Sequence, residues 1–217
     1  MFKGYGITHV FYVPQVISTA LVAMEDLGIR RVVAHSEKGA AYMADGYARA
    51  KGAPGVCLAQ PIGASNLASG LRDAFMAHSP VIAISGGPAP VSRYRHAYQE
   101  VEDFGQFDCV TKANYNVDTV GRLPDLIRQA FRDATTGSPG PVHLRFQGRR
   151  SDAPLGAGDI EAVCEPQFGS VPPFRPRPEP HRVKDGVAAL IAAKRPVIVA
   201  GGGVVHSKAQ KEVVELA

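Results

Sequence analysis

The chain has 217 residues, more than the roughly 100–200 usual for one domain, so we expect one complete domain and part of another. Its hydrophobic content of 45% is enough for a packed core and excludes a disordered chain. The 24 Lys and Arg residues only slightly outnumber the 20 Asp and Glu residues, and no run of like charges marks a binding patch. We therefore expect neither nucleic acid nor a membrane as a partner.

The three cysteines, Cys57, Cys109 and Cys164, are widely spaced and odd in number. This pattern fits neither a disulfide framework nor paired metal ligands. The N-terminus lacks the basic and then apolar pattern of a signal peptide, and no apolar stretch is long enough to cross a bilayer. These features predict a soluble, cytoplasmic protein with reduced thiols.

Short apolar, β-branched runs alternate with amphipathic segments over the first 146 residues, which is typical of βαβ units. Helix ends are marked by Gly28 and Gly52, and Pro124 marks a helix start. The predicted fold is α/β, an open parallel six-stranded sheet with helices on both faces. We expect strands at 9–13, 31–34, 55–60, 81–85, 112–117 and 142–146, and helices at 17–27, 38–51, 66–77 and 124–135.

The composition changes at residues 148–182, where prolines and glycines replace any sustained helix or strand period. We interpret this stretch as a linker between a first domain at 1–147 and a second at 183–217. In the second we expect a helix at 183–193, a buried strand at 196–200, a tight turn at Gly201-Gly202-Gly203 and a helix at 207–217. So short a segment can hardly bury its own core, which predicts an α/β domain that the chain leaves truncated.

Glu37 stands where the second strand ends and a helix begins, and ligands collect at the carboxyl ends of strands in open α/β sheets. We therefore predict that Glu37 is a functional residue. The alternative is that Glu37 only complements the positive end of the helix dipole, which is a common surface role.

Five segments, in this order, resemble the N-terminal pyrimidine-binding domain of thiamine-diphosphate enzymes of the acetolactate synthase-like family. They are Gly6-Ile7-Thr8-His9-Val10-Phe11, His35-Ser36-Glu37-Lys38-Gly39-Ala40-Ala41, Asp45-Gly46-Tyr47-Ala48-Arg49, Gly63-Ala64-Ser65-Asn66-Leu67 and Ala97-Tyr98-Gln99-Glu100.

The resemblance implies roles for individual residues. Glu37 would be catalytic: its family counterpart hydrogen-bonds N1′ of the aminopyrimidine, so that the 4′-nitrogen can take the C2 proton. A carboxyl group in a dry pocket suits such proton sharing. The implied cofactor-binding residues are Pro14, Glu37, Gly63, Asn66 and Gln99.

Simpler interpretations stay open beside these roles. Ser65 or Asn66 could serve only as helix N-caps. Glu100, Glu102 and Asp103 could form a solvated acidic loop. Arg93 and Arg95 could contact an anionic group or lie in solvent.

The chain also departs from the family pattern. Pro14-Gln15-Val16 replaces Pro-Gly-Gly or Pro-Gly-Ser, and Gln60-Pro61-Ile62-Gly63 replaces Thr-Ser-Gly-Pro-Gly. The family's Gly-Asp-Gly anchor for the diphosphate and Mg²⁺ is missing, so we expect no metal ligands here and Mg²⁺ held by a domain absent from this chain. The chain alone should be inactive.

We therefore expect part of a thiamine-diphosphate-dependent carboligase or 2-oxo-acid decarboxylase, a lyase or transferase acting on a small 2-oxo-acid-type substrate. The expected partners are a second copy, in a homodimer or homotetramer, or a separate diphosphate-binding subunit. Whether a downstream domain carries FAD or an ADP-like group stays open. The alternatives are a non-catalytic α/β dimerisation module derived from this family and a dinucleotide-dependent oxidoreductase built on the Gly201 turn.

Overall fold

The computed structural model describes residues 1–14, 17–89, 93–102, 104–147 and 160–217. The chain divides into two compact units, Met1–Pro173 and Phe174–Ala217. In the described ranges, no helix combines the length and the apolar character that a membrane span requires.

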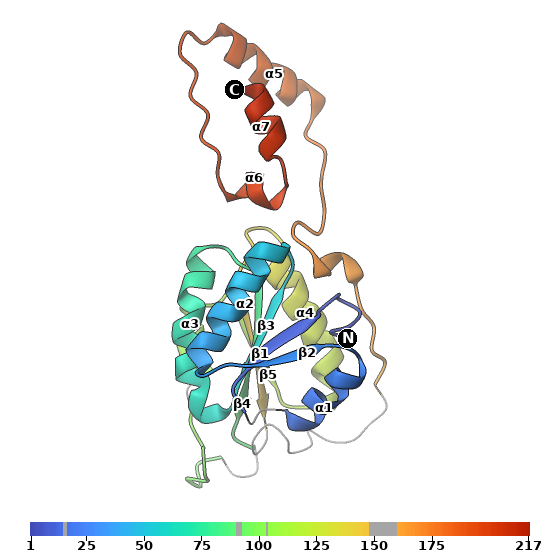
Figure 1. Cartoon of the computed structure of the whole chain (residues 1–217), viewed down its shortest axis with the longest axis vertical. Coiled ribbons are helices and arrows are strands. Elements are labelled where there is room, and N and C mark those ends of the chain that lie inside the picture. Colours follow the sequence, from blue (N-terminus) through green and yellow to red (C-terminus); the bar gives the residue numbers. More distant parts are fainter. Residues whose placement is uncertain (15–16, 90–92, 103, 148–159) are drawn as a thin grey trace. The chain divides into compact units, whose positions relative to one another are not determined.

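The first unit is built on six parallel strands, as predicted (Figure 1). Their order across the sheet is β2-β1-β3-β4-β6-β5, and every neighbouring pair is parallel. Because the strands are parallel, all their carboxyl ends lie at one edge. The strands are β1 (His9–Tyr12), β2 (Arg30–Val33), β3 (Gly55–Ala59), β4 (Val81–Gly87), β5 (Ala113–Val117) and β6 (Val142–Gln147).

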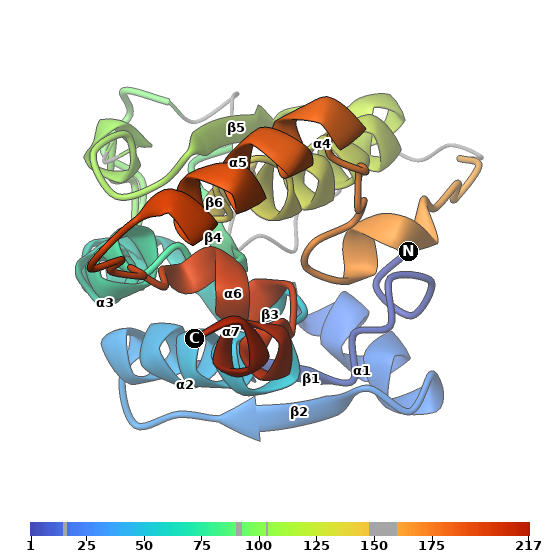
Figure 2. The ribbon, with the colours of Figure 1, turned by 90° about the horizontal axis from the view of Figure 1, so that it is seen from above.

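Helices cover both faces of this sheet, which confirms the predicted fold class (Figure 2). One face carries α1 (Ser18–Asp26) and α4 (Leu123–Thr135), and the other carries α2 (Glu37–Lys51) and α3 (Ala64–Met76). Two apolar cores result, because strand side chains point alternately to the two faces. Short 3₁₀ helices are η1 (Pro61–Gly63), η3 (Phe104–Phe107), η4 (Val120–Arg122) and η6 (Pro166–Gly169).

Residues 160–173, which we call the return segment, pack against the rest of the first unit. Phe168 is buried in the core that also holds Tyr5 and Phe131. Arg132 of α4 donates two hydrogen bonds of 2.7 Å to the carboxylate of Glu165. The scheme of a domain at 1–147, a linker at 148–182 and a second domain at 183–217 stays a prediction.

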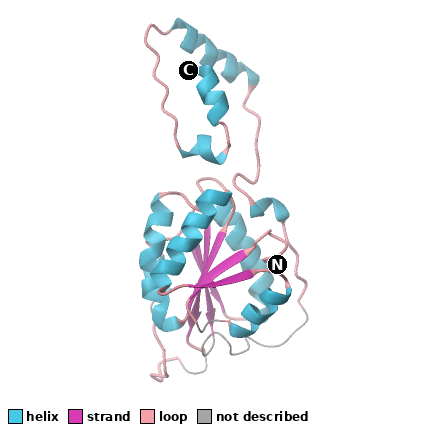
Figure 3. Cartoon of the chain, viewed as in Figure 1, coloured by secondary structure: helices cyan, strands magenta, loops and turns pink. Residues whose placement is uncertain are grey.

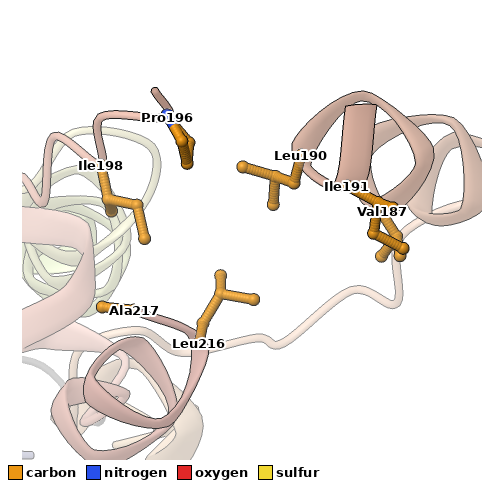
Figure 4. Close-up of a pocket in the computed structure, with 7 residues that line it drawn as sticks. All are labelled: Val187, Leu190, Ile191, Pro196, Ile198, Leu216 and Ala217. Carbon is orange, nitrogen blue, oxygen red and sulfur yellow. The ribbon is translucent and has the colours of Figure 1, made fainter. Parts of the chain in front are cut away.

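The second unit contains α5 (Pro180–Ala192), α6 (Gly202–His206) and α7 (Gln210–Leu216). The prediction of a buried strand at 196–200 is wrong: these residues are exposed and form no strand (Figure 3). A strand needs a hydrogen-bonded neighbour, and the described part of this unit offers none. An apolar hollow of about 500 Å³ lies there instead, lined by Val187, Leu190, Ile191, Pro196, Ile198, Leu216 and Ala217 (Figure 4).

The cysteines Cys57, Cys109 and Cys164 are all free thiols. Cys57 lies within β3, and burial raises the pKa of its thiol well above the usual range. This thiol therefore stays protonated and acts as a small apolar core group.

Candidate functional site

Glu37 is the first residue of α2, at the carboxyl edge of the sheet. Ser36 is the N-cap, and its hydroxyl accepts a 3.1 Å hydrogen bond from the backbone N–H of Gly39. This cap fixes where the helix begins. Only 9% of Glu37 is exposed, which shows that its side chain is turned inward. A surface role in which Glu37 merely complements the helix dipole does not fit this burial.

Gly63 faces the carboxyl group of Glu37. It ends the short η1 helix that joins β3 to α3. A Cβ atom on Gly63 would lie 2.5 Å from Oε1 and 2.6 Å from Cδ of Glu37, closer than real Cβ atoms come to other atoms. Only glycine therefore allows the turn and the carboxylate to approach one another in this way.

Asn66 holds the other oxygen of the carboxylate. Its Nδ2 donates a 3.2 Å hydrogen bond to Oε2 of Glu37. The α3 helix already begins at Ala64, its N-cap is Gly63, and no side chain caps it. The interpretation of Ser65 or Asn66 as N-cap is therefore wrong, and the amide of Asn66 orients Glu37 instead.

Gln99 reaches the same turn from the segment 93–102. Its Nε2 donates a 3.1 Å hydrogen bond to Oε1 of Gln60, and the carbonyl of Gln60 accepts a 3.0 Å bond from the N–H of Gly63. Oε1 of Gln99 is buried and has no hydrogen-bond partner among the described residues. A buried amide oxygen without a donor is costly, which favours a ligand donor at this place.

These contacts bring four of the five predicted cofactor-binding residues into one connected set, which we call the Glu37 cluster. It consists of Glu37, Gln60, Gly63, Asn66 and Gln99. The fifth predicted residue, Pro14, lies exposed in the loop after β1. Residues 15–16 of that loop lie outside the described residues. His35 is exposed as well.

Gln60 is the member of the cluster that was not predicted as a site residue. A signal was present in the sequence, because Gln60 is the first polar residue after the buried run of β3. Polar side chains at that place in an open α/β sheet often face a ligand.

Two glutamates organise the segment that carries Gln99. The carboxylate of Glu100 accepts hydrogen bonds from the backbone N–H groups of Tyr94 and Ala97, the second at 2.8 Å. Partial desolvation acts to raise the pKa of Glu100, but these N–H groups and the nearby His96 together hold its pKa below the usual value. Glu102 forms ion pairs with Arg93 and Arg145. Glu100 and Glu102 therefore have defined partners within the protein, Glu102 is also exposed to solvent, and Asp103 lies outside the described residues.

A metal centre of protein ligands is not found in the described part of the chain. No three His, Cys, Asp or Glu side chains there are placed to hold an ion.

Comparisons with known proteins agree with this fold and with the predicted resemblance. Residues 1–107 match the family described as thiamine pyrophosphate enzyme, N-terminal TPP binding domain. The chain is 36% identical over 198 residues to the probable acetolactate synthase large subunit of Methanocaldococcus jannaschii, covering 90% of this chain and 33% of that protein. It is 36% identical over 192 residues to acetolactate synthase isozyme 1 large subunit of Escherichia coli K12, covering 87% of this chain and 33% of that protein.

A solved structure shows the same fold. The crystal structure of benzoylformate decarboxylase from Polynucleobacter necessarius aligns with a TM-score of 0.80 and 19% identity, over 98% of this chain and 39% of that one. This chain thus spans about a third of the length of the curated relatives named above.

Proposed function

We propose that this chain, which belongs to the acetolactate synthase-like thiamine pyrophosphate enzymes as an N-terminal part, binds the aminopyrimidine half of thiamine diphosphate in the Glu37 cluster. The observation that carries the proposal is the buried carboxylate of Glu37 packed against a glycine that has no room for a side chain. Burying a carboxylate costs free energy, so a buried carboxylate in this setting points to a role in chemistry or binding rather than in packing.

The donors and acceptors of the cluster fit an aminopyrimidine. Glu37 can share a proton with a ring nitrogen, and the unpartnered Oε1 of Gln99 can accept a hydrogen bond from an exocyclic amino group. Asn66 fixes the orientation of the carboxylate. The diphosphate half and its Mg²⁺ are proposed to be held by another part of the protein, because the Gly-Asp-Gly anchor is missing from this sequence.

The role of each residue follows from its contacts. When bound, thiamine diphosphate supplies the electron sink for breaking or forming a bond beside a carbonyl. Glu37 holds and exchanges a proton at the pyrimidine ring nitrogen. Gly63 lets the turn lie against the carboxylate of Glu37, and the buried setting keeps water from competing for that carboxylate.

The complete enzyme of which this is a part is proposed to be a carboligase or 2-oxo-acid decarboxylase acting on a small 2-oxo acid. Its Mg²⁺ would be held outside this chain. A second copy or a separate diphosphate-binding subunit would complete the site.

The first prediction concerns Glu37 and is tested on the chain itself. Titration with 4-amino-5-hydroxymethyl-2-methylpyrimidine should shift the backbone NMR signals of Glu37, Gly63 and Asn66 in wild type. The Glu37→Gln variant should lose the proton-sharing group and weaken binding about tenfold or more. The matched control is Glu25→Gln, which removes an ion-paired surface carboxylate on α1 and should bind as wild type does.

A second titration adds Mg²⁺ and thiamine diphosphate to the chain mixed with the diphosphate-binding domain of an acetolactate synthase. Calorimetry should show binding in the mixture that Glu37→Gln weakens. If neither the pyrimidine fragment nor the mixture gives binding while both proteins are folded and associate, the chain is a non-catalytic module of this family instead.

A further inference from the structure

The segment 93–102 has a backbone conformation that needs outside support. Tyr94, His96 and Gln99 have φ angles of 64°, 53° and 62°, in the left-handed region that residues with a side chain avoid. Each such conformation is unfavourable, and it persists only where surrounding contacts require it. Contacts that hold this segment therefore decide where Gln99 stands.

One support comes from within the segment. Glu100 accepts hydrogen bonds from the N–H groups of Tyr94 and Ala97, and its own N–H donates a 2.9 Å bond to the carbonyl of Ala97. These bonds shape the turn. They do not attach the turn to the rest of the unit.

Besides the hydrogen bond from Gln99 to Gln60, an attachment point is provided by Arg145 on β6, which is 2% exposed. Its Nε donates a 2.8 Å hydrogen bond to Oδ1 of Asn116 on β5. Its guanidinium carbon lies 4.6 Å from the ring centroid of Phe104, and its Cδ would be 2.9 Å from a Cβ on Gly87. Arg145 is thus a positive charge that the sheet and its covering loop hold in one place.

Glu102 joins the segment to this fixed charge. Its Oε2 lies 3.5 Å from Nη1 of Arg145, and its Oε1 lies 3.0 Å from Nε of Arg93. One carboxylate therefore stands between two guanidinium groups, one at the start of the segment and one on β6. Removing the carboxylate would leave the buried charge of Arg145 without an ionic partner among the described residues, which is costly.

We propose that Glu102 is a positioning residue: by bridging Arg93 and Arg145 it fixes the segment 93–102 on the sheet and so places Gln99 against Gln60 in the Glu37 cluster. The benefit for cofactor binding rests on the proposed function. The bridge itself does not, and it can be measured without any cofactor.

The test is amide hydrogen exchange by NMR on the 217-residue chain, comparing wild type with Glu102→Gln. The hydrogen-bonded amides of Tyr94, Ala97 and Glu100 report on the segment. We expect about tenfold faster exchange at these amides, because a partly exposed ion pair to a buried charge is lost. Amides of β3 and β4 should keep their wild-type rates, and the Nε2 signals of the Gln99 side chain should shift.

The matched control is Glu165→Gln. Glu165 lies in the return segment, and its carboxylate is paired with Arg132 of α4. This substitution should speed exchange near residues 160–173 and leave the segment 93–102 unchanged. Arg93→Gln should reproduce the effect of Glu102→Gln, and the double variant should add little to either, as expected for two residues in one bridge.

Two outcomes would overturn the proposal. Unchanged exchange at Tyr94, Ala97 and Glu100 in Glu102→Gln would show that other contacts hold the segment. An equal rise at all amides, β3 and β4 included, would show general destabilisation rather than positioning. Failure of the pyrimidine fragment to bind would instead count against the proposed function and leave the exchange result standing.

Discussion

Gly63 defines the site as much as Glu37 does, because the position of the carboxylate depends on a missing side chain. The second prediction is that Gly63→Ala pushes the carboxyl group of Glu37 away, since the new methyl group would come within 2.6 Å of its Cγ, Cδ and Oε1. Binding of the pyrimidine fragment should fall about tenfold or more, as expected when one bound group is misplaced. Circular dichroism should show that the variant keeps its secondary structure.

Gly46→Ala is the matched control for this substitution. Gly46 lies in the middle of α2, and a Cβ there would meet nothing within 4 Å. Alanine should therefore leave binding unchanged and raise the free energy of unfolding by up to about 1 kcal/mol through its higher helix propensity. Equal loss of binding in both variants would mean that Gly63 has no special place beside Glu37.

Sequence reasoning reaches Glu37 because it stands where the second strand gives way to a helix, where the fold class alone puts a ligand site. It reaches Gly63 through the family resemblance. It does not reach the pairing of Gln60 with Gln99, which lie on segments that follow β3 and β4. Their contact depends on how residues 93–102 fold back, and the positive φ angles there leave no reliable trace in the sequence. The role of Asn66 was open for a related reason, since an N-cap and a carboxylate partner require the same residue type.

At the scale of elements, β6 shows how a polar face can be buried. His143 and Arg145 alternate with apolar residues, a pattern that normally indicates a solvated face. The structure instead covers this face with η3: the ring of Phe107 stacks on His143 with centroids 3.5 Å apart. The imidazole is also hydrogen-bonded to Ser85 at 2.8 Å and to Asn114 at 2.7 Å.

The third prediction follows from the titration of His143. Burial, with a smaller contribution from the positive charge of Arg145, lowers its pKa well below 6.5. Below about pH 6.5, His143 is protonated in the unfolded chain but stays neutral in the folded chain. The neutral, buried His143 therefore costs no stability above about pH 6.5. As the pH falls from there toward the folded pKa, the free energy of unfolding decreases by up to about 1.4 kcal/mol per pH unit.

Urea unfolding of wild type and His143→Gln between about pH 8 and pH 5 measures this effect. Glutamine can keep hydrogen bonds to Ser85 and Asn114 without titrating, so the variant should lose less stability on acidification. The exposed His35 provides a control, because His35→Gln should follow the wild-type curve. Parallel curves for wild type and His143→Gln would rule out His143 as the titrating group.

The strands and helices of the first unit were predictable to within a few residues, because periodicity and end signals such as Gly28 and Gly52 are local. The prediction of a strand at 196–200 was wrong because a strand also depends on non-local partners. The apolar, β-branched run there meets the local requirement, but a strand is stable only beside another strand, and partners lie beyond the reach of local patterns.

At the scale of the whole molecule, the return segment belongs to the first compact unit, Met1–Pro173. Prolines and glycines indicate a linker in residues 148–182, yet Phe168 is only 6% exposed and a Cβ on Gly169 would lie 2.3 Å from the carbonyl oxygen of Tyr5. Such packing depends on single residues within an otherwise linker-like stretch. The average composition of the stretch does not indicate the packing of these single residues.

The fourth prediction is that a chain ending at residue 173 is more stable than one ending at residue 147. The shorter chain loses the burial of Phe168, which contributes about 1.5–3 kcal/mol. It also loses the ion pair between Arg132 and Glu165. Urea unfolding should show the difference, and Phe168→Ala in the longer chain should reproduce most of it. Equal midpoints for the two lengths would mean that the return segment does not stabilise the first unit.

The position of the return segment also sets an order of events during synthesis on the ribosome. Tyr5 and Phe131 stack on each other in the core that Phe168 completes, and Val171 donates a 3.0 Å hydrogen bond to the carbonyl of Gly52. All six strands emerge before these last contacts can form. A nascent chain therefore keeps one side of its core incomplete until the return segment has emerged.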